Sequence, residues 1–375
     1  MKRILILMGR YLPGYKDGGP VRTIKNLSDI LGKEYDIRIM CHDRDHGDIK
    51  PYPNINVNSY NQVGNAKVYY FKDGKYKIGT LLKEIKKADV VYCCGPYDMY
   101  AIKVMILKRF KLFKQSLVVA SMGSFSKGAL SLKSKKKTIF LNFMKKFGLF
   151  KNITWSVTSR VEEKELKAVI GDNARCIIAE DLPRVEKINH IHKKEKNKLK
   201  VVFISRISRK KNLLKAIEIL SNIKQYSIEF HIFGNIEDKI YWDECKIQLE
   251  KLPLNISWEY KGECNSDNVV VTLANYDVFL FPTFGENFGH VISESLIAGC
   301  LPIISNTTPW IDLDEHKCGN VISLDCMNDF VECLESYIAM DEKEFNKFVA
   351  NAQNYIFDKN AISIKNTGYK EIFDI

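Results

Sequence analysis

The sequence predicts an α/β protein of two domains, each with a parallel sheet covered by helices. Its 375 residues exceed the roughly 250–300 that one hydrophobic core usually serves. Apolar strand-like runs alternate with amphipathic helix-like stretches, which is typical of parallel sheets with crossover helices. A polar, charge-rich segment at 181–200 separates two such alternations and is expected to be a linker. We therefore expect a first domain over 1–185, a second over 197–355, and a C-terminal helix over 356–375 that returns to the first domain.

The same alternation gives the order of the elements. In the first domain, expected strands cover residues 3–8, 36–41, 68–71, 90–95, 117–122 and 154–159, with expected helices at 21–32 and 78–88. In the second domain, expected strands cover 201–205, 228–234, 256–262, 278–282 and 301–305, and expected helices cover 212–223, 239–252 and 290–299. The residues after about 326 have a helical, polar-faced pattern.

The formal net charge of +12 is concentrated in one stretch of the first domain. No acidic residue occurs between Asp98 and Glu162, whereas fourteen Lys and Arg residues do. Residues 101–114 and 135–150 mix Lys with Ile, Leu, Phe and Met at near-helical spacing, as in basic helices on an anionic lipid surface. The alternative is a pair of half-buried helices with solvated lysines. Nucleic acid is not predicted as a partner, because no nucleic-acid-binding module accompanies the charge.

The remaining composition predicts a cytoplasmic protein. The apolar run near the N-terminus is short and is followed by Gly-rich turn residues in place of a cleavage site, so a first strand is expected there. No stretch approaches the roughly 20 apolar residues that cross a bilayer. Ten cysteines occur without Cys-x-x-Cys or zinc-ligand spacing, which fits a reducing compartment and predicts no metal site.

The strongest local motif is FPTFGENFGHVISESLIAGCLPIIS, at residues 281–305. Gly285 and Gly289 flank a strand-to-helix turn, where glycine lets the backbone approach a ligand and the helix N-terminus favours a phosphate. Glu286 and Glu294 are eight residues apart, about 9–10 Å along a helix axis, which is too far for one acid–base pair. We expect these carboxylates to bracket a diphosphate and to accept hydrogen bonds from sugar hydroxyls.

Two other turns after expected strands have phosphate-binding character. The segment VVFISRISRKKN, at 201–212, places Arg206 and Lys211 where cations can neutralise the charge on a leaving diphosphate. Near the N-terminus, Gly18 and Gly19 precede a helix that opens with proline, and we expect this turn to face a phosphate or an acceptor. The turn matches neither the G-x-G-x-x-G dinucleotide fingerprint nor a P-loop.

The segment with Glu286 and Glu294, together with Arg206, Lys211 and the early Gly-Gly-Pro turn, resembles the retaining GT-B glycosyltransferase family numbered four. The resemblance spans nearly the whole chain in order, and the Glu-x7-Glu segment is its most specific part. Within that family the chain is similar to bacterial enzymes that build O-antigen, capsule or other surface polysaccharides. The resemblance implies two Rossmann-like domains facing a cleft, with a nucleotide sugar held chiefly by the second domain and no metal or other cofactor.

The resemblance also implies roles for individual residues. Arg206 and Lys211 would bind the donor diphosphate and form the catalytic set with Glu286, which would contact the transferred sugar. The other implied donor contacts are Gly18, Gly19, Gly234, Lys261, Glu263, Gly285, Asn287, Phe288, Gly289 and Glu294, the last of them at the ribose hydroxyls. Many relatives carry a His where this chain reads SMGS at 121–124, so no His is assigned. The leaving phosphate is expected to accept the acceptor's proton instead.

Two further features are weaker candidates. Asp43-Arg44-Asp45 imitates the Asp-x-Asp metal signature of another glycosyltransferase architecture but lacks its surroundings. A solvated loop is the expected structure there, with acceptor contact as an alternative and metal binding as a weaker one. His290, at the start of the helix in the Glu-x7-Glu segment, is expected to cap or pack that helix rather than to act as a catalyst.

The predicted function is transfer of a sugar from a nucleoside-diphosphate sugar to a saccharide, with UDP favoured over GDP by family habit. If the basic helices face lipid, the acceptor is expected to be linked to a lipid diphosphate and the enzyme to lie on the inner face of the plasma membrane. One alternative is a non-catalytic nucleotide-sugar or membrane-surface binding protein of the same fold. Another is a nucleotide-sugar-modifying enzyme, which the missing dinucleotide fingerprint disfavours.

Overall fold

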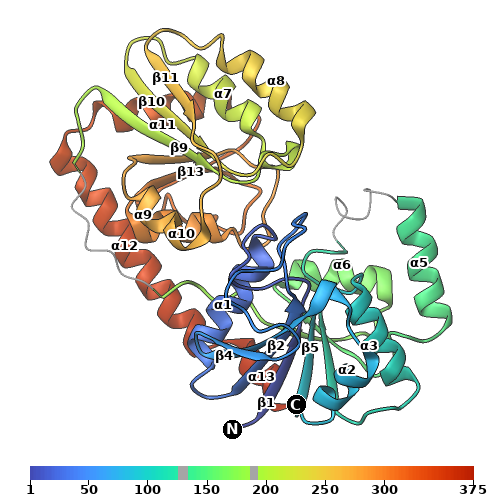
Figure 1. Cartoon of the computed structure of the whole chain (residues 1–375). Helices are drawn as coiled ribbons and strands as arrows, with labels where there is room; N and C mark the ends of the chain where they lie inside the picture. Colours follow the sequence, from blue (N-terminus) through green and yellow to red (C-terminus); the bar gives the residue numbers. More distant parts are fainter. Residues whose placement is uncertain (126–133, 186–192) are drawn as a thin grey trace. The chain divides into compact units, whose positions relative to one another are not determined.

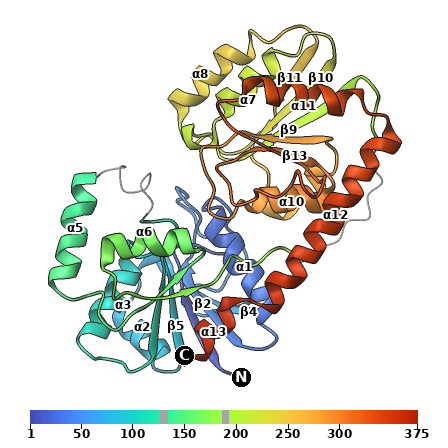
Figure 2. The same cartoon turned by 180° about the vertical axis from the view of Figure 1, so that it is seen from behind.

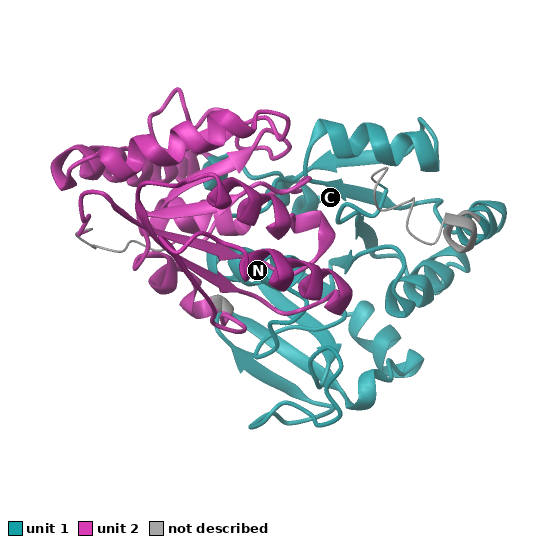
Figure 3. Ribbon diagram, turned by 90° about the horizontal axis from the view of Figure 1, so that it is seen from above, with its two compact units in different colours: residues 1–182, 363–375 teal, residues 183–362 magenta. Residues whose placement is uncertain are grey.

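The structure is a computed structural model that describes residues 1–125, 134–185 and 193–375. The chain divides into two compact units (Figure 3), one of residues 1–182 with 363–375 and the other of residues 183–362. Each unit contains one sheet flanked by helices (Figure 1), so the predicted α/β architecture with two parallel-sheet domains is confirmed. Part of the predicted linker, 186–192, and part of the basic stretch, 126–133, lie outside the described residues.

The first unit contains an eight-stranded sheet with the order β3-β4-β2-β1-β5-β6-β7-β8. Its strands are β1 (Arg3–Leu7), β2 (Asp36–His42), β3 (Tyr60–Val63), β4 (Ala66–Phe71), β5 (Val90–Cys94), β6 (Ser116–Ala120), β7 (Thr154–Val157) and β8 (Arg175–Ile178). All neighbours pair in parallel except β3 and β4, which are antiparallel. The two strands absent from the sequence prediction, β3 and β8, both lie at the ends of this sheet.

Helices cover both faces of the first sheet (Figure 2). They are α1 (Gly19–Leu31), α2 (Ile78–Ile85), α3 (Met99–Arg109), α5 (Ser134–Lys146), α6 (Arg160–Ile170) and α13 (Gly368–Asp374), with a 3-10 turn η1 (Lys72–Gly74). Successive residues of β1 enter opposite cores: Ile4 and Ile6 pack in the core with α1 and α13, and Leu5 and Leu7 pack in the core with α2 and α3. Burial on both faces explains why this strand is continuously apolar.

The second unit contains a six-stranded, fully parallel sheet with the order β11-β10-β9-β12-β13-β14. The strands are β9 (Lys198–Ile204), β10 (Ser227–Phe233), β11 (Ile256–Tyr260), β12 (Val278–Phe281), β13 (Leu301–Ser305) and β14 (Asn320–Ile322). The helices are α7 (Leu213–Ser221), α8 (Lys239–Leu249), α9 (Val269–Leu273), α10 (His290–Ala298), α11 (Met327–Ala339) and α12 (Glu342–Lys365), with 3-10 turns η2 (Arg209–Lys211) and η3 (Ser266–Asn268). Strand β9 begins inside the segment predicted as linker, and β14 was not predicted.

The C-terminal helices connect the two units along the chain. Helix α12 is continuous, with residues up to Ile362 in the second unit and its last residues in the first. Helix α13 then packs in the first unit, where Tyr369 and Phe373 are buried in the core. Gly368 begins this helix, and a Cβ there would lie 1.9 Å from the Ile178 carbonyl oxygen, so only glycine fits. Among the described helices, none is both long enough and apolar enough to cross a membrane.

Among the parallel strands, the order of each sheet reverses once, between β1 and β5 in the first unit and between β9 and β12 in the second. At such a point the loops after two adjacent strands diverge to opposite faces, and the crevice between them is where open α/β sheets bind ligands. The turn with Gly18 and Gly19 follows β1. Arg206 follows β9, and Glu286 follows β12. Three of the predicted binding segments therefore lie at the reversal points of their own sheets.

Candidate functional site

The candidate site lies at the carboxyl edge of the second sheet, where the loops after β9 and β12 meet. Lys211 ends the 3-10 turn η2 after β9, and Glu286 lies in the loop between β12 and α10. Lys211 Nζ donates a hydrogen bond to Glu286 Oε1 across 75 positions of sequence. Both side chains are only 12% exposed. Two residues that the sequence predicts separately thus form a largely buried ion pair at the reversal point of the sheet.

The environment of Lys211 weakens its hold on its proton. Burial lowers the pKa of Lys211, and the nearby positive charges of Arg206 and Lys210 lower it further. The Glu286 carboxylate acts in the opposite direction and raises this pKa. The Lys211 ammonium also lies 5.6 Å from the centre of the Phe281 ring. A buried cation that depends on one carboxylate is suited to accept a second anion, because added negative charge stabilises its protonated form.

Hydrogen bonds fix the loops that present this pair. The Lys210 carbonyl accepts bonds from Phe284 N at 2.9 Å and from Thr283 Oγ1 at 3.1 Å. The side-chain amide of Asn212, which has the left-handed conformation at φ 59°, donates to the Pro282 carbonyl at 2.9 Å. On the other side, Thr307 Oγ1 donates to the Thr283 carbonyl at 2.8 Å. The loops after β9, β12 and β13 are therefore tied together by groups that the sequence prediction did not single out.

The glycines of the Glu-x7-Glu segment occupy conformations that other residues rarely adopt. Gly285 has φ 155°, and Gly289, which precedes α10, has φ 79°. A Cβ on Gly289 would lie 2.9 Å from Ile292 Cδ1. The first turn of α10 presents backbone N–H groups that the helix's own carbonyls do not satisfy. This N-terminus therefore provides the positive end of a helix dipole next to the Glu286 loop, as phosphate binding requires.

Trp310, after β13, supports that helix N-terminus. Its Nε1–H donates a 2.6 Å hydrogen bond to the Phe288 carbonyl, and its ring makes an edge contact with Phe288. Lys359 of α12 lies over the Trp310 ring at 5.2 Å. Sequence reasoning missed Trp310. The only sequence signal for a role of Trp310 is that an aromatic residue follows shortly after an expected strand, in the segment TTPW at 307–310.

The other predicted residues of the second unit are placed differently. Arg206 is half exposed and forms a two-contact pair with Glu237, at 2.9 and 3.0 Å, which the sequence did not predict. Glu294 is buried on α10. Asn287 is exposed in the loop before α10. The structure thus brings Lys211 and Glu286 into contact but directs the Arg206 side chain to another acid.

The loops after β10 and β11 contain the remaining predicted contacts. Gly234 has φ 145°, and a Cβ there would lie 1.7 Å from the Ser205 carbonyl oxygen. Its N–H donates to the Gly262 carbonyl at 2.8 Å, so the ends of β9, β10 and β11 are drawn together around it. Lys261, directly after β11, pairs with Glu259 of that strand, and Glu263 is exposed. Of this group, only Gly234 lies so close to a neighbouring backbone that an added Cβ would collide with it.

In the first unit, the predicted glycine turn is shaped by a buried acid. Gly18 has φ 66°, and Gly19 begins α1. Asp45 is buried and accepts backbone hydrogen bonds from Tyr15 at 2.9 Å and Lys16 at 3.2 Å, just before the turn. Asp43 is also buried and pairs with Arg44. The expected solvated loop at 43–45 is therefore wrong, because both carboxylates are needed as internal hydrogen-bond acceptors.

The loop after β6 contains a buried acid that the sequence prediction also missed. At the position where no His was assigned, Met122 and Gly123 have positive φ. The Gly123 N–H donates to Glu162, and Thr158 donates to the same carboxylate through its N–H and its hydroxyl. Glu162 therefore holds this loop in place from the first turn of α6. Across the described ranges, no group of three or more His, Cys, Asp and Glu side chains is arranged to hold a metal ion.

Comparison with known proteins shows which class of enzyme the chain resembles. Residues 184–355 match the model of the family described as Glycosyl transferases group 1, which corresponds to nearly all of the second unit. The chain is a glycosyltransferase of the GT-B fold. No curated protein sequence matches this glycosyltransferase at a significant level.

Solved structures resemble the glycosyltransferase over its whole length. Sucrose-phosphate synthase from Thermosynechococcus elongatus superposes with a TM-score of 0.71 at 13% identity, covering 97% of each chain. HepE from Anabaena in complex with UDP-glucose gives 0.68 at 15% identity, covering 100% of each chain. WaaG, a glycosyltransferase involved in lipopolysaccharide biosynthesis, gives 0.65 at 14% identity, covering 98% of each chain. At these identities the likeness establishes the GT-B fold and no substrate.

Proposed function

We propose that the protein is a retaining transferase that moves a sugar from a nucleoside-diphosphate sugar to a saccharide acceptor. The observation that carries the proposal is the Lys211–Glu286 pair beside the α10 N-terminus. It provides a cation for a diphosphate, a carboxylate for sugar hydroxyls and helix amides for a phosphate, all at one sheet edge. Membership of family four and a role in bacterial O-antigen or capsule synthesis are part of the proposal and rest on the motifs.

In the proposed reaction, the bond between the sugar's anomeric carbon and the diphosphate oxygen breaks as the acceptor oxygen attacks from the same face. The leaving diphosphate receives the bonding electrons and then the acceptor's proton. Lys211 and Arg206 stabilise the charge that develops on it. To bind the diphosphate, Arg206 must leave Glu237. The free-energy cost is low, because the Arg206–Glu237 pair is half exposed and such pairs contribute only about 0–1 kcal/mol to stability.

The donor is proposed to be a UDP-sugar and the acceptor a saccharide on a lipid diphosphate. Similar structures are described in complexes with UDP-glucose, for HepE from Anabaena, and with UDP, for TarM of S. aureus. Lipid linkage is supported by the basic stretch of the first unit, which favours contact with the inner face of an anionic membrane. No metal or other cofactor is included in the proposed mechanism.

The proposal is tested first by the thermal stability of the full chain with a panel of nucleotide sugars. A ligand at a hundred times its Kd adds about 2.7 kcal/mol to stability, so the true donor raises Tm measurably. Transfer to extracted lipid-linked saccharides with that donor then tests catalysis. Stabilisation without transfer or donor hydrolysis would instead indicate a non-catalytic binding protein. The absence of stabilisation by any nucleotide sugar would contradict the proposal.

Trp310→Phe is expected to weaken donor binding about five- to tenfold, since it removes a hydrogen bond worth about 1 kcal/mol from the Phe288 carbonyl. Isothermal calorimetry with the donor measures the effect. Trp258→Phe is the matched control, because Trp258 is half-buried on β11, away from this loop. Equal donor affinities in the two variants would show that Trp310 does not position the binding loop.

Glu286→Gln is expected to move the alkaline loss of donor affinity to lower pH. Glu286 raises the pKa of Lys211, whereas burial, Arg206 and Lys210 lower it. Without the carboxylate, the pKa of Lys211 falls, so the ammonium loses its proton earlier as pH rises. Donor Kd measured across alkaline pH checks this, with Glu237→Gln as control, since Glu237 is not among the groups that shift this pKa. An unchanged midpoint in Glu286→Gln would exclude the coupling.

A further inference from the structure

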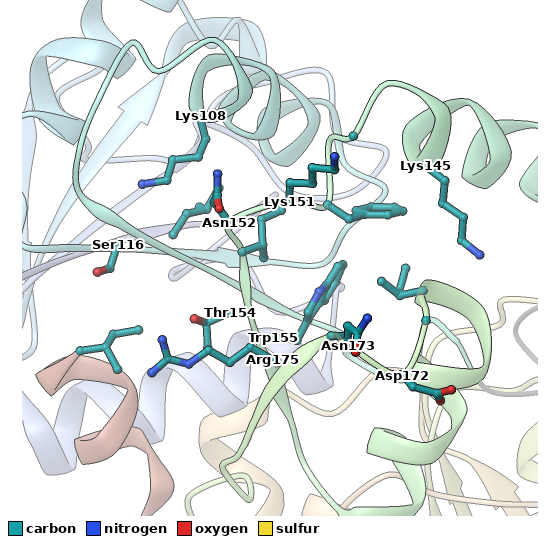
Figure 4. Close-up of a pocket in the computed structure, with 18 of the residues that line it drawn as sticks. Lys108, Ser116, Lys145, Lys151, Asn152, Thr154, Trp155, Asp172, Asn173 and Arg175 are labelled. Carbon is teal, nitrogen blue, oxygen red and sulfur yellow. The ribbon is translucent and has the colours of Figure 1, made fainter.

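A pocket of about 960 Å³ lies at the amino ends of β6, β7 and β8 in the first unit (Figure 4). The C-terminal ends of α3, α5 and α6 surround it, because each of these helices runs back to the edge where the next strand begins. The turn with Gly18 and Gly19 follows the carboxyl end of β1, at the opposite edge of this sheet. The pocket is therefore separate from the predicted phosphate- or acceptor-facing turn of the same unit.

The pocket is strongly cationic. Five basic side chains and one acidic side chain line it: Lys108, Lys114, Lys145, Lys151, Arg175 and Asp172. Lys108 Nζ donates to the carbonyls of Lys114 at 3.2 Å and Gln115 at 2.6 Å, and burial lowers its pKa. In the described part of the chain, the other four basic side chains form no ion pair. The three helix C-termini contribute about −0.5 charge each, which offsets fewer than two of the five cations.

Large apolar side chains are exposed beside this pocket. On α5 and the turn after it, the rings of Phe143 and Phe147 lie 4.3 Å apart, and each ring is 53% exposed. Phe110 at the end of α3 is 71% exposed, and Leu112 follows it. Arg109 Nε donates to the Phe147 carbonyl at 3.2 Å, so the ends of α3 and α5 form one surface. We call the pocket cations and these four apolar residues the basic-aromatic surface.

We propose that the basic-aromatic surface docks on a bilayer containing anionic phospholipids. The pocket takes headgroup phosphates, while Phe110, Phe143 and Phe147 enter the boundary between headgroups and acyl chains. Charge complementarity identifies the occupant as anionic. The exposed phenylalanine and leucine side chains favour lipid over nucleic acid, whose phosphate backbone offers them no apolar contact. The proposal deepens the proposed function by naming the surface that carries its membrane contact, but it rests only on residues of the first unit.

Vesicle co-sedimentation of the full chain tests the proposal. The protein is expected to bind vesicles of equimolar phosphatidylcholine and phosphatidylglycerol, and not vesicles of phosphatidylcholine alone. The triple change Lys114→Gln, Lys151→Gln, Arg175→Gln is expected to weaken binding about a hundredfold, at about 1 kcal/mol per cation. The matched control is Lys33→Gln, Lys67→Gln, Lys72→Gln, which removes the same charge from exposed positions near the β4 end of the sheet. Equal loss in the two triples would overturn the proposal.

A second variant separates a bilayer from other polyanions. Phe143→Ser with Phe147→Ser changes exposed residues, so folding is preserved, and it is expected to weaken vesicle binding while binding to heparin stays unchanged. Ile49→Ser with Ile78→Ser, also exposed, is the control. Binding to heparin or duplex DNA without binding to anionic vesicles would overturn the proposal. Donor-induced stabilisation is measured on the unmodified chain and on the same variants. If the donor stabilises the unmodified chain but that chain does not bind anionic vesicles, only the docking surface is refuted.

Discussion

Lys211→Ala is expected to lower kcat by about a hundred- to a thousandfold, or roughly 3–4 kcal/mol of transition-state stabilisation. Lys211 is held at the mouth of the second sheet by Glu286 and is largely shielded from water. A cation in such a place stabilises charge on a leaving diphosphate more than a solvated one does. Single-turnover transfer rates, with the donor identified by thermal stabilisation, measure the effect at saturating donor.

Lys210→Ala is the matched control, because Lys210 is the adjacent cation but is exposed. Its effect on kcat is expected to stay within a few-fold. Lys211→Ala leaves the Glu286 carboxylate without its cation, so circular dichroism must show that the variant is folded at the assay temperature. Should it fail to fold, Lys211→Gln keeps a hydrogen-bond donor for Glu286 and removes the charge. A folded, uncharged variant with nearly normal kcat would refute the catalytic role of Lys211.

The sequence was sufficient to predict the strands that are buried on both faces. The segments at 90–95 and 301–305 are continuously apolar because helices cover both sides of their sheets, and β5 and β13 lie there. The missed strands lack this signal. Strand β3 reads YNQV and pairs only with β4, and β14 has three residues at the end of its sheet. Short strands at the end of a sheet are defined by their neighbours and not by their own periodicity.

The candidate site was predictable only in part. Arg206, Lys211 and Glu286 could be grouped because turns after adjacent parallel strands meet at one edge of a sheet. The Arg206–Glu237 pair could not, because side chains on exposed loops exchange partners at little cost. The prediction of a solvated loop at Asp43 and Asp45 was wrong. Charged residues in a polar segment usually face water, whereas here Asp45 accepts hydrogen bonds from two backbone N–H groups. Such hydrogen bonds depend on loop paths that composition does not determine.

Gly234→Ala is expected to destabilise the protein by about 3 kcal/mol and to abolish measurable donor binding. The left-handed backbone at φ 145° disfavours a side chain, and the new Cβ would lie 1.7 Å from the Ser205 carbonyl oxygen. A carbon and an oxygen that are not bonded to each other cannot lie so close together. The ends of β9 and β10 must therefore separate. Arg206 follows Ser205 directly, and its position next to the Lys211–Glu286 pair is lost with that separation.

Gly262→Ala distinguishes backbone strain from this close approach. Gly262 also has positive φ, at 79°, and lies on the neighbouring strand end, but a Cβ there meets no atom within 4 Å. It is therefore expected to cost only about 1 kcal/mol. Urea titration of the full chain, followed by tryptophan fluorescence, compares the two variants, since Trp242, Trp258 and Trp310 all report on the second unit. If both substitutions cost the same, β9 and β10 are not held together at Gly234, and the placement of Arg206 has another cause.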